Sequence, residues 1–430
     1  MLDIISALIT LGAIMVLGFL GNYIFNKTQI PSIVWLLFFG LIVGVIFNVQ
    51  NISENLLMTI SEFFAAIAIV IILFDGGINT DLYQLFRGAP RGLLLSISGF
   101  SLSVIGTMFI VLGLSFSGIL NVSLGNSVII GIILGAIVGG TSSPIVIPLA
   151  CKLQNLQRKT KTILSIESMI TDPLCIVVVL AAFYMVTASG GIDISIGIKN
   201  LVITFSVGAV LGFVFGLIWL PIMHKVRKEQ FSYVVTLSVV FLVYSFTALI
   251  VGIKGGGTGA GAIACLIFGL VLGNGKKVLK MFNYSGRGYE IDEETKQFHS
   301  LTSFIIRTFF FVYLGMMVSF QKIEFIIFGI VILAILLSLR YLAILISTYK
   351  DNFEKDDIQT MTVMFPRGLA AAILALNFGP QLVEELMPGM EGFFKDIVFV
   401  IILGTAIICT VGVSVISHIE KQKLILEENN

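Results

Sequence analysis

The stretch that decides the fold runs from Ser165 to Pro173. It reads Ser-Ile-Glu-Ser-Met-Ile-Thr-Asp-Pro and continues as LCIVVVLAAF. Glu167 and Asp172 therefore lie within an apolar run long enough for a membrane helix, which needs about 20 residues. Because a charge in a bilayer core is costly, such acids usually face a protein interior or an aqueous path. We therefore expect an all-α polytopic membrane protein whose buried charges have a function.

The composition also indicates a membrane protein. Hydrophobic residues make up 57% of the 430 residues and charged residues only 12%, about half the usual share in soluble domains. The mean hydropathy is +1.04. A net charge of +1 gives no field that would favour a nucleic-acid partner. The four cysteines lack CxxC or metal spacing, so no disulfide framework, zinc site or resident cofactor is expected.

About thirteen apolar segments are candidates for membrane-spanning helices. They lie near residues 2–24, 31–49, 58–79, 92–116, 125–150, 163–188, 197–222, 230–252, 258–274, 300–319, 323–347, 357–379 and 394–417. If the segments alternate in direction, one side of the membrane carries most Lys and Arg residues, and the other carries only Lys199, Lys254, Lys322 and Lys395. The positive-inside rule then places the N-terminus outside and the C-terminus in the cytoplasm, with the chain in the plasma membrane. The whole chain, 1–430, is predicted to be one membrane domain without a soluble regulatory domain.

Asp172 is the leading candidate for an ion-binding residue. A carboxylate removed from water can hold either a proton or a small cation, so two ions can compete for one group. Ser168 lies one turn earlier on the same helical face, and Thr171 is adjacent, so both hydroxyls are candidate ligands of a hard cation. Pro173 cannot donate to the carbonyl of Met169, which leaves that oxygen free. The alternative is a structural ion pair in an inactive scaffold.

Two further segments contain interruptions that indicate broken helices. The first reads GGTSSP and the second reads MFPRG. Paired broken helices at corresponding places in two halves indicate an inverted-repeat transporter with a midplane site. For each motif alone, a proline kink in an ordinary helix is the alternative. The residues expected to interrupt helices are Gly139, Gly140, Pro144, Pro366 and Gly368, together with Pro173 in the segment around Asp172.

The hydroxyl groups of the first interruption and an acid upstream complete the candidate ion site. Thr141, Ser142 and Ser143 supply hydroxyl and backbone oxygens of the kind that hard cations prefer. Asp75, in LFDGG, is either an ion-path residue or an interfacial acid that meets water. The metal expected near Asp172 is Na⁺ or K⁺.

The remaining buried charges are predicted to compensate one another. Glu167 does not share a face cleanly with Asp172, so we expect a structural role for Glu167, paired with Arg340 and also with Arg367. Arg367 can additionally offset the negative end of a half-helix. The alternative for Glu167 is a second ion carrier. Arg307 either snorkels to the inner surface or joins the buried network.

These residues resemble the monovalent cation:proton antiporter superfamily, and in particular the NhaP-like sodium/proton antiporters. The strongest piece is ESMITD, residues 167–172, which is similar to the family signature E-S-x-x-[N/D]-D. An acid and two basic residues that resemble further family elements stand at Asp75, Arg340 and Arg367. The resemblance extends through most of the chain.

The resemblance implies a homodimer with a thirteen-helix inverted-repeat fold and two crossed discontinuous helices. It also implies an elevator-like movement of an ion-binding core against a dimer domain. We expect the core helices at about 92–188 and 323–417, and the dimer or scaffold helices at about 2–79 and 197–319.

Two departures from the family pattern bear on selectivity and stoichiometry. In the family, Asn before the key aspartate usually accompanies electroneutral exchange and Asp electrogenic exchange. Here that residue is the uncharged Thr171, which favours one ion per proton. Many sodium-selective members have T-D-P in the first broken helix, whereas this chain has Ser143 in place of that carboxylate. A site with fewer charges can suit potassium.

We therefore predict a secondary active antiporter that exchanges Na⁺, or Li⁺, for H⁺ by competition at Asp172, electroneutrally and with elevator-like alternating access. A K⁺/H⁺ antiporter of the same fold is the alternative. Its partners are the monovalent cation, the proton and the lipid bilayer. Enzyme signatures such as HExxH and GxSxG are absent, so we expect no enzyme. A carrier for an organic solute or a passive ion channel is the alternative of another class.

Overall fold

The computed structural model describes most of the chain as helix, and no strand occurs among the residues it describes. These are residues 2–28, 30–47, 54–81, 90–153, 156–187, 194–226, 229, 231–252, 257–281, 293–318 and 322–428. The predicted all-α fold class is confirmed.

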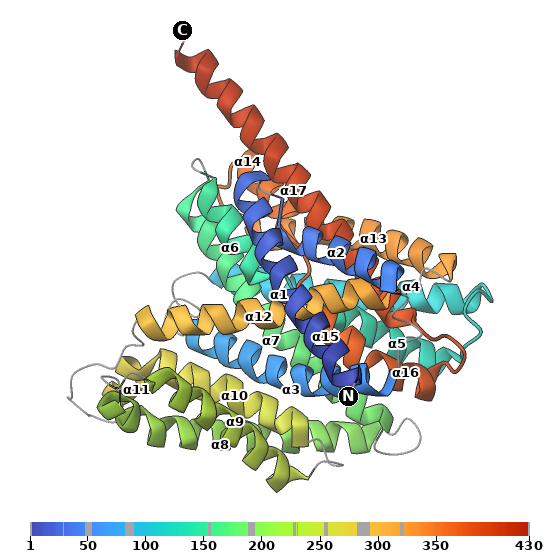
Figure 1. Cartoon of the computed structure of the whole chain (residues 1–430). Helices are drawn as coiled ribbons and strands as arrows, with labels where there is room; N and C mark the ends of the chain where they lie inside the picture. The colour runs from blue at the N-terminus through green and yellow to red at the C-terminus, as the bar shows by residue number, and fades with distance from the viewer. Residues whose placement is uncertain are drawn as a thin grey trace.

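The described part of the chain forms a layered bundle of helices (Figure 1). In chain order they are α1 (Leu2–Thr28), α2 (Ser32–Phe47), α3 (Glu54–Asn79), α4 (Pro90–Phe116), α5 (Leu124–Ile137), α6 (Ser143–Lys152), α7 (Arg158–Thr187), α8 (Ile194–Val226), α9 (Ser232–Val251), α10 (Gly257–Gly273), α11 (Gly275–Met281), α12 (Glu293–Met317), α13 (Ile323–Thr348), α14 (Lys355–Val363), α15 (Leu369–Asn377), α16 (Gly379–Leu386) and α17 (Phe393–Glu428). Each of the predicted apolar segments falls on one of these helices or on a broken pair of them.

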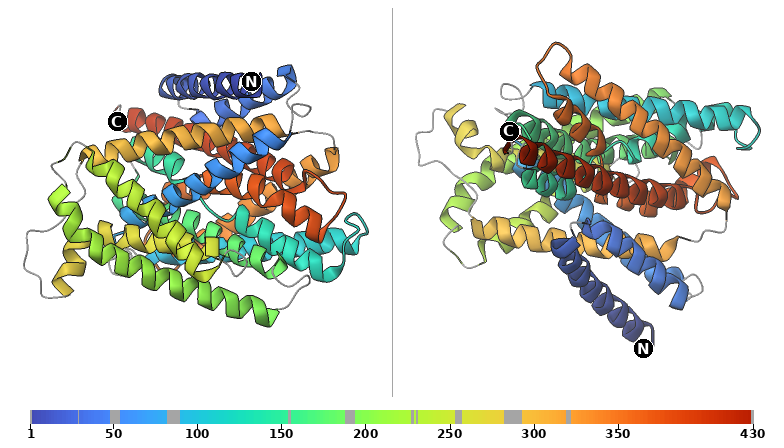
Figure 2. Two further views of the ribbon diagram at one scale, coloured as in Figure 1. Left: turned by 60° about the horizontal axis from the view of Figure 1, so that its bottom comes forward. Right: turned by 90° about the horizontal axis from the view of Figure 1, so that it is seen from above.

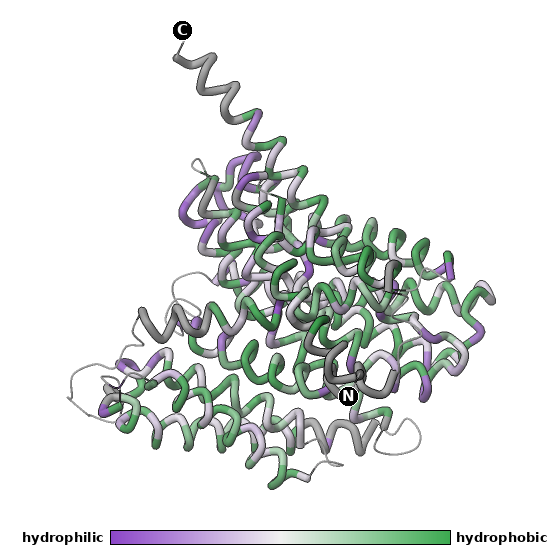
Figure 3. The backbone as a smooth tube through the Cα atoms, in the orientation of Figure 1, coloured by the Kyte–Doolittle hydropathy of each residue, from purple (hydrophilic) through white to green (hydrophobic). Residues whose placement is uncertain are grey.

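The helices are apolar along most of their length (Figure 3). Among the described residues, seven helices are long and apolar enough to cross a membrane, and the bent pair α15–α16 makes eight if it counts as one span. Five shorter apolar helices, within α1, α2, α5, α10 and α12, occupy other predicted segments. Large apolar side chains are exposed on the outer helices, as expected for a protein whose surface meets lipid.

Two of the predicted segments are interrupted at the predicted places. Segment 125–150 divides into α5 and α6, and segment 357–379 divides into α14 and α15, with non-helical backbone between the halves. The two interruptions meet, because the backbone N–H of Ser142 donates to the carbonyl of Pro366 at 2.8 Å. Pro144 lies in the first turn of α6, where a missing N–H costs nothing, so it starts the second half-helix. A further bend of 47° separates α15 from α16.

Close approaches between helices depend on small residues. A Cβ atom on Gly40 of α2 would lie 2.2 Å from the carbonyl oxygen of Val312 on α12, and one on Gly315 would lie 2.4 Å from that of Leu37. Helix α10 packs against α8, α3 and α9, whereas α4 packs against α5, α13 and α7 (Figure 2). Helix α7 contacts members of both groups, α3 and α8 on one side and α4, α5, α6 and α15 on the other. It therefore lies where a site between the two groups can form.

Candidate functional site

Helix α7 carries the predicted carboxylate into the centre of the fold. The sequence predicts an interruption at Pro173, but α7 continues through this proline without ending, so that prediction is wrong and the missing N–H lies inside the helix. One residue earlier, the Asp172 carboxylate accepts a hydrogen bond from the backbone N–H of Ser143, the first residue of α6. The N-terminal end of a helix has free N–H groups and a partial positive charge, which stabilise a carboxylate there.

Asp172 faces a cavity of about 360 Å³. One wall comes from α3 and α12, and the other comes from α6, α7 and α15. The lining residues are Ile71, Ile72, Asp75, Gly76, Asn79, Ser303, Ile306 and Arg307 on the first wall, and Ser142, Ser143, Pro144, Ile147, Pro148, Met169, Asp172, Pro173 and Leu369 on the second. The cavity thus brings two acids, one base and several neutral oxygen-bearing groups together in an otherwise apolar interior.

Four of the seven residues predicted to bind ions line this cavity: Asp75, Ser142, Ser143 and Asp172. The other three are buried next to it without being part of its lining. They are Thr141, Ser168 and Thr171. The Ser168 hydroxyl donates to the carbonyl of Ser165 at 3.2 Å.

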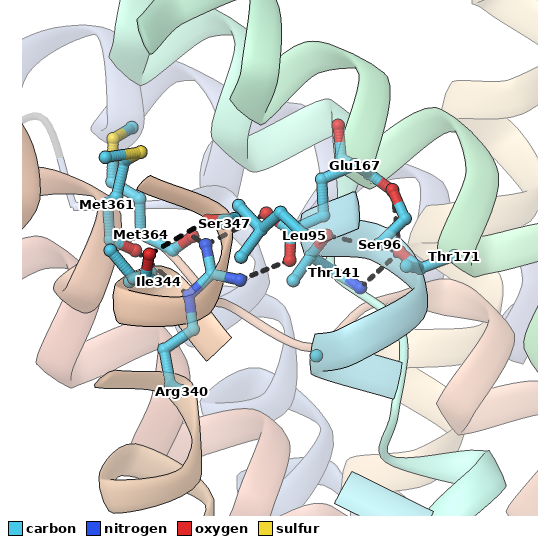
Figure 4. Close-up of polar contacts among 12 residues, drawn as sticks. Leu95, Ser96, Thr141, Glu167, Thr171, Arg340, Ile344, Ser347, Met361 and Met364 are labelled. Carbon is cyan, nitrogen blue, oxygen red and sulfur yellow. Dashed lines mark hydrogen bonds and ion pairs between the residues drawn. The ribbon is translucent and has the colours of Figure 1, made fainter. Parts of the chain in front are cut away.

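Thr171 uses its hydroxyl to hold the first interruption. Its oxygen accepts the backbone N–H of Thr141 at 3.0 Å and lies 3.2 Å from the Thr141 hydroxyl oxygen. The Thr171 hydroxyl also lies 3.0 Å from the carbonyl of Glu167, to which it donates (Figure 4). These contacts occupy the hydrogen-bonding capacity of the Thr171 oxygen. Its place in the structure is therefore that of a positioning residue.

The stretch LFDGG brings Asp75 to the cavity from α3. A Cβ atom on Gly76 would lie 2.7 Å from Cγ of Pro173, so the glycine permits α3 to approach α7 closely. The side-chain amide of Asn79 donates to Oδ1 of Asp75 at 2.7 Å and to its carbonyl at 3.1 Å. Asp75 and Asp172 therefore line the same cavity.

Glu167 and Arg340 form a buried ion pair away from the cavity lining (Figure 4). Their side chains are 3% exposed, and Nη2 of Arg340 lies 2.9 Å from Oε2 of Glu167 in addition to the Nη1–Oε1 contact. The guanidinium also donates to the carbonyls of Met361 at 3.0 Å and Met364 at 3.4 Å, at the end of α14. The pair thus connects α7, α13 and α14.

Arg367 occupies the equivalent position at the end of α5. Its Nη1 donates to the carbonyls of Gly139 at 3.0 Å and Gly140 at 2.9 Å. The sequence suggested Glu167 as a partner, but the hydrogen bonds of this guanidinium go to the two carbonyls. A cation is stabilised there because the C-terminal end of a helix carries partial negative charge. Each broken helix therefore has an arginine at the negative end of its first half.

Several residues that shape the candidate site had no signal in the sequence. Thr405 on α17 accepts the backbone N–H of Arg367 at 3.0 Å and so holds the second interruption as Thr171 holds the first. Asn79, Ser303 and Pro148 line the cavity. A single hydroxyl or amide in an apolar segment does not reveal from sequence whether it bonds its own helix or a neighbouring one.

A second cavity, of about 390 Å³, adjoins the first. Its lining includes Thr80 and Asp81, which follow α3, and Arg158 and Lys161 in the first turns of α7. Asn79 and Met169 line both cavities, and Asn79 is itself exposed. The two cavities therefore meet at Asn79, on the side of the bundle where α7 begins.

Comparisons with known proteins agree with this architecture. Na(+)/H(+) antiporter 1 of Methanocaldococcus jannaschii is 28% identical over 420 residues, which cover 95% of this chain and 92% of that protein. Probable Na(+)/H(+) antiporter 2 of the same organism is 24% identical and covers 85% of both chains. The solved structure of the sodium proton antiporter MjNhaP1 from that organism at pH 8 matches with a TM-score of 0.74, at 23% identity and 97% coverage of each chain, and so has the same fold.

The family model described as sodium/hydrogen exchanger, transmembrane, matches residues 12–419. This is the relationship that the signature at residues 167–172 predicts. Because the match spans nearly the whole chain, this protein belongs to the transmembrane sodium/hydrogen exchanger family.

Proposed function

We propose that this protein is a secondary active antiporter that exchanges a monovalent cation, Na⁺ first, for H⁺ by competition at Asp172. The observation that carries the proposal is the position of Asp172 in one cavity with Asp75, Ser142 and Ser143. Carboxylate, hydroxyl and backbone oxygens are the ligands that hard cations take. The family relationship supports exchange of these two ions.

Competition follows from the chemistry of one buried carboxylate. When ionised, Asp172 attracts a cation, and when protonated it has no charge to offer. Moving a bare carboxylate through a low-dielectric interior is costly. The site therefore moves readily between the two sides of the membrane when a cation or a proton neutralises Asp172. When Asp172 is ionised and empty, the site stays on the side where it released its ion.

The two walls of the cavity suggest how access alternates. Asp75, Asn79 and Arg307 belong to helices of the predicted scaffold, whereas Asp172 and Ser143 belong to the predicted core. A movement of the core along α3 and α12 would carry Asp172 past the fixed wall. Elevator-like access of this kind is part of the proposal, as are the homodimer, the plasma-membrane location and the outside position of the N-terminus.

Cation selectivity and stoichiometry depend on the small number of charges at the first interruption. Ser143 lies where many sodium-selective relatives are expected to have an aspartate, and Thr171 adds no charge beside Asp172. We propose one cation per proton, with sodium or lithium preferred and potassium as the alternative cation.

The test is exchange in proteoliposomes that contain a pH-reporting dye. Sodium, lithium, potassium or choline is added outside for the wild type, for Asp172→Asn, and for Glu391→Gln as a control at an exposed acid. We expect a cation-driven pH change in the wild type and the control and none in Asp172→Asn. The order of the cations then decides between sodium and potassium.

The proposal fails if the wild type moves no protons with any cation. It also fails in its mechanism if Asp172→Asn exchanges ions like the wild type. An imposed membrane potential checks the stoichiometry, because one-for-one exchange carries no net charge and its rate should not respond.

A further inference from the structure

Arg307 is a positively charged residue in a cavity that is proposed to bind cations. It lies on α12, within the apolar part of that helix, residues 301–317, and lines the same cavity as Asp75 and Asp172. Ser303, one turn earlier on the helix, lines the cavity too. A fixed positive charge repels a bound cation strongly in a low-dielectric site. The positive charge of Arg307 therefore affects how strongly the cavity binds a cation.

The net charge of the cavity lining can be counted from its ionisable residues. Its only ionisable lining residues among those described are Asp75, Asp172 and Arg307. With all three ionised the lining carries a net charge of −1, so a single monovalent cation or a single proton neutralises it. Without Arg307 the same lining would carry a net charge of −2 and would attract cations and protons more strongly.

The other buried arginines have different partners. The guanidinium of Arg340 is paired with Glu167, and that of Arg367 donates to backbone carbonyls at the end of α5. Neither residue lines the cavity. Arg307 is therefore the basic residue of the lining itself, where it interacts with Asp75, whereas Arg367 acts on Asp172 from outside the lining.

The elements packed against α12 add few other charges. Asp75 comes from α3, and Asp172 faces the cavity from α7. On α9, Tyr233 shares a hydrogen bond with Thr302 of α12. Helices α2 and α15 contain no ionisable residue, and the ionisable residues of α1 and α17 do not line the cavity.

We propose that Arg307 is a fixed counter-cation of this cavity: it offsets the charge of Asp75 and leaves Asp172 as the carboxylate that takes up one cation or one proton. Arg307 thereby sets the apparent affinity for both ions. This inference rests on the proposed exchange at Asp172 and adds a residue that tunes it.

The experiment uses the proteoliposome assay with Arg307→Gln, Arg307→Lys, Asp75→Asn and the double variant Arg307→Gln/Asp75→Asn. Lys27→Gln, at an exposed end of α1, is the control for loss of a positive charge elsewhere. The apparent KM for sodium is measured at alkaline pH, where protons compete least. The pH of half-maximal exchange is then measured on the acidic side.

Arg307→Gln is expected to lower KM by about tenfold or more, because an opposite charge at close range typically shifts a carboxylate's proton affinity by at least about tenfold. The acidic half-maximum should move to higher pH in this variant, since Asp172 then binds protons more tightly too. Asp75→Asn should shift both quantities the opposite way. The double variant should lie between the two single variants, and Arg307→Lys should shift KM far less than Arg307→Gln.

Equal effects of Gln and Lys at position 307 would overturn the proposal, because a structural role does not depend on charge. A double variant no closer to the wild type than Arg307→Gln would overturn the offset between Arg307 and Asp75. If Arg307→Gln does not fold, Asp75→Asn alone decides, and an unchanged or lower KM contradicts the proposal. Failure of the wild type to exchange ions would instead refute the proposed function.

Discussion

Thr171 positions the residue that follows it. Its hydroxyl accepts the N–H of Thr141 and donates to Glu167, so it connects α7 to the first interruption beside Asp172. Thr171→Val keeps the shape but leaves the buried N–H of Thr141 without its acceptor, which costs about 1–3 kcal/mol. We expect lower thermal stability and slower exchange for Thr171→Val. Thr171→Ser keeps the hydroxyl and should resemble the wild type in both.

The Val and Ser variants form a matched pair, since each loses one group of the threonine. Thermal unfolding in detergent and proteoliposome exchange are measured on both. If the two variants behave alike, the hydroxyl has no positioning role and the hydrogen bond from Thr141 is dispensable.

The Glu167–Arg340 pair should behave as a buried ion pair. Removing one partner leaves the other charge buried without compensation, and such losses cost about 3–5 kcal/mol. We expect Glu167→Gln and Arg340→Met each to lower the unfolding temperature strongly. The double variant should lose less than the sum of the two, as double-mutant cycles show for residues in contact. Additive losses would contradict a direct pairing.

At the residue scale, the sequence predicted the acids better than the hydroxyls. Asp172 and Asp75 could be identified because a charge in an apolar membrane segment is costly and usually has a function. Both residues line the cavity. The partner of a threonine hydroxyl depends on which helices become neighbours, so neither the bond from Thr171 to the interruption nor the role of Thr405 could be predicted. Arg307 was predicted to be buried or interfacial, and only the packing of α12 against α3 places it in the cavity.

At the element scale, the first broken helix depends on a glycine. A Cβ atom on Gly140 would lie 2.7 Å from Sγ of Cys175 and 3.2 Å from Oδ1 of Asp172. We expect Gly140→Ala to push the interruption away from α7 and to lower exchange several-fold. Gly113→Ala, at a helical glycine with nothing within 4 Å of the added atom, is the matched control and should be neutral.

The cause of the Gly140→Ala defect is tested by making room for the added methyl group. Cys175→Ala removes the nearest atom, so Gly140→Ala/Cys175→Ala should recover part of the lost exchange rate. No recovery would mean that contact with Cys175 is not the reason for the defect.

The interruptions themselves were predictable because Gly and Pro disrupt an apolar helix wherever they cluster. Their meeting was implied only by the family resemblance, since nothing local in the sequence brings Ser142 to Pro366. The bend between α15 and α16 had no prediction. It follows an asparagine and precedes Gly379 and Pro380, where a helix readily ends and another begins.

For the whole molecule, charged residues at one end of the bundle connect distant segments. Asp351, between α13 and α14, accepts a hydrogen bond from Lys159 of α7, and its Oδ2 lies 3.7 Å from Nε of Arg91 on α4. The Lys159 hydrogen bond holds the pKa of Asp351 below its usual value. A carboxylate with a lowered folded-state pKa contributes stability above its unfolded pKa, about 3.9, and loses it as pH falls through the lowered value.

We therefore expect the difference in unfolding temperature between the wild type and Asp351→Asn to stay constant from about pH 8 to pH 5 and to shrink in stronger acid. Thermal scans of both proteins over this range measure it. A difference that grows towards acid pH would contradict the assigned direction of the shift.

The thirteen predicted segments account for nearly every long helix of the molecule, because length and hydropathy are properties of each segment alone. Which helices become neighbours is set by shape. Glycine pairs such as Gly40 and Gly315 let backbones touch, and that complementarity is not visible until both helices are in place.

The contact between the two interruptions also restricts which pairs of residues can evolve at positions 142 and 368. Ser142 and Gly368 lie far apart in the chain, yet a Cβ atom on Gly368 would lie 2.7 Å from Cβ of Ser142. The two codons therefore cannot drift independently: a larger residue at 142 is compatible only with glycine at 368, and a side chain at 368 requires a smaller residue at 142. Among descendants of this sequence, glycine should therefore stay at 368 wherever residue 142 has a Cβ atom, and a side chain at 368 should appear only together with glycine at 142.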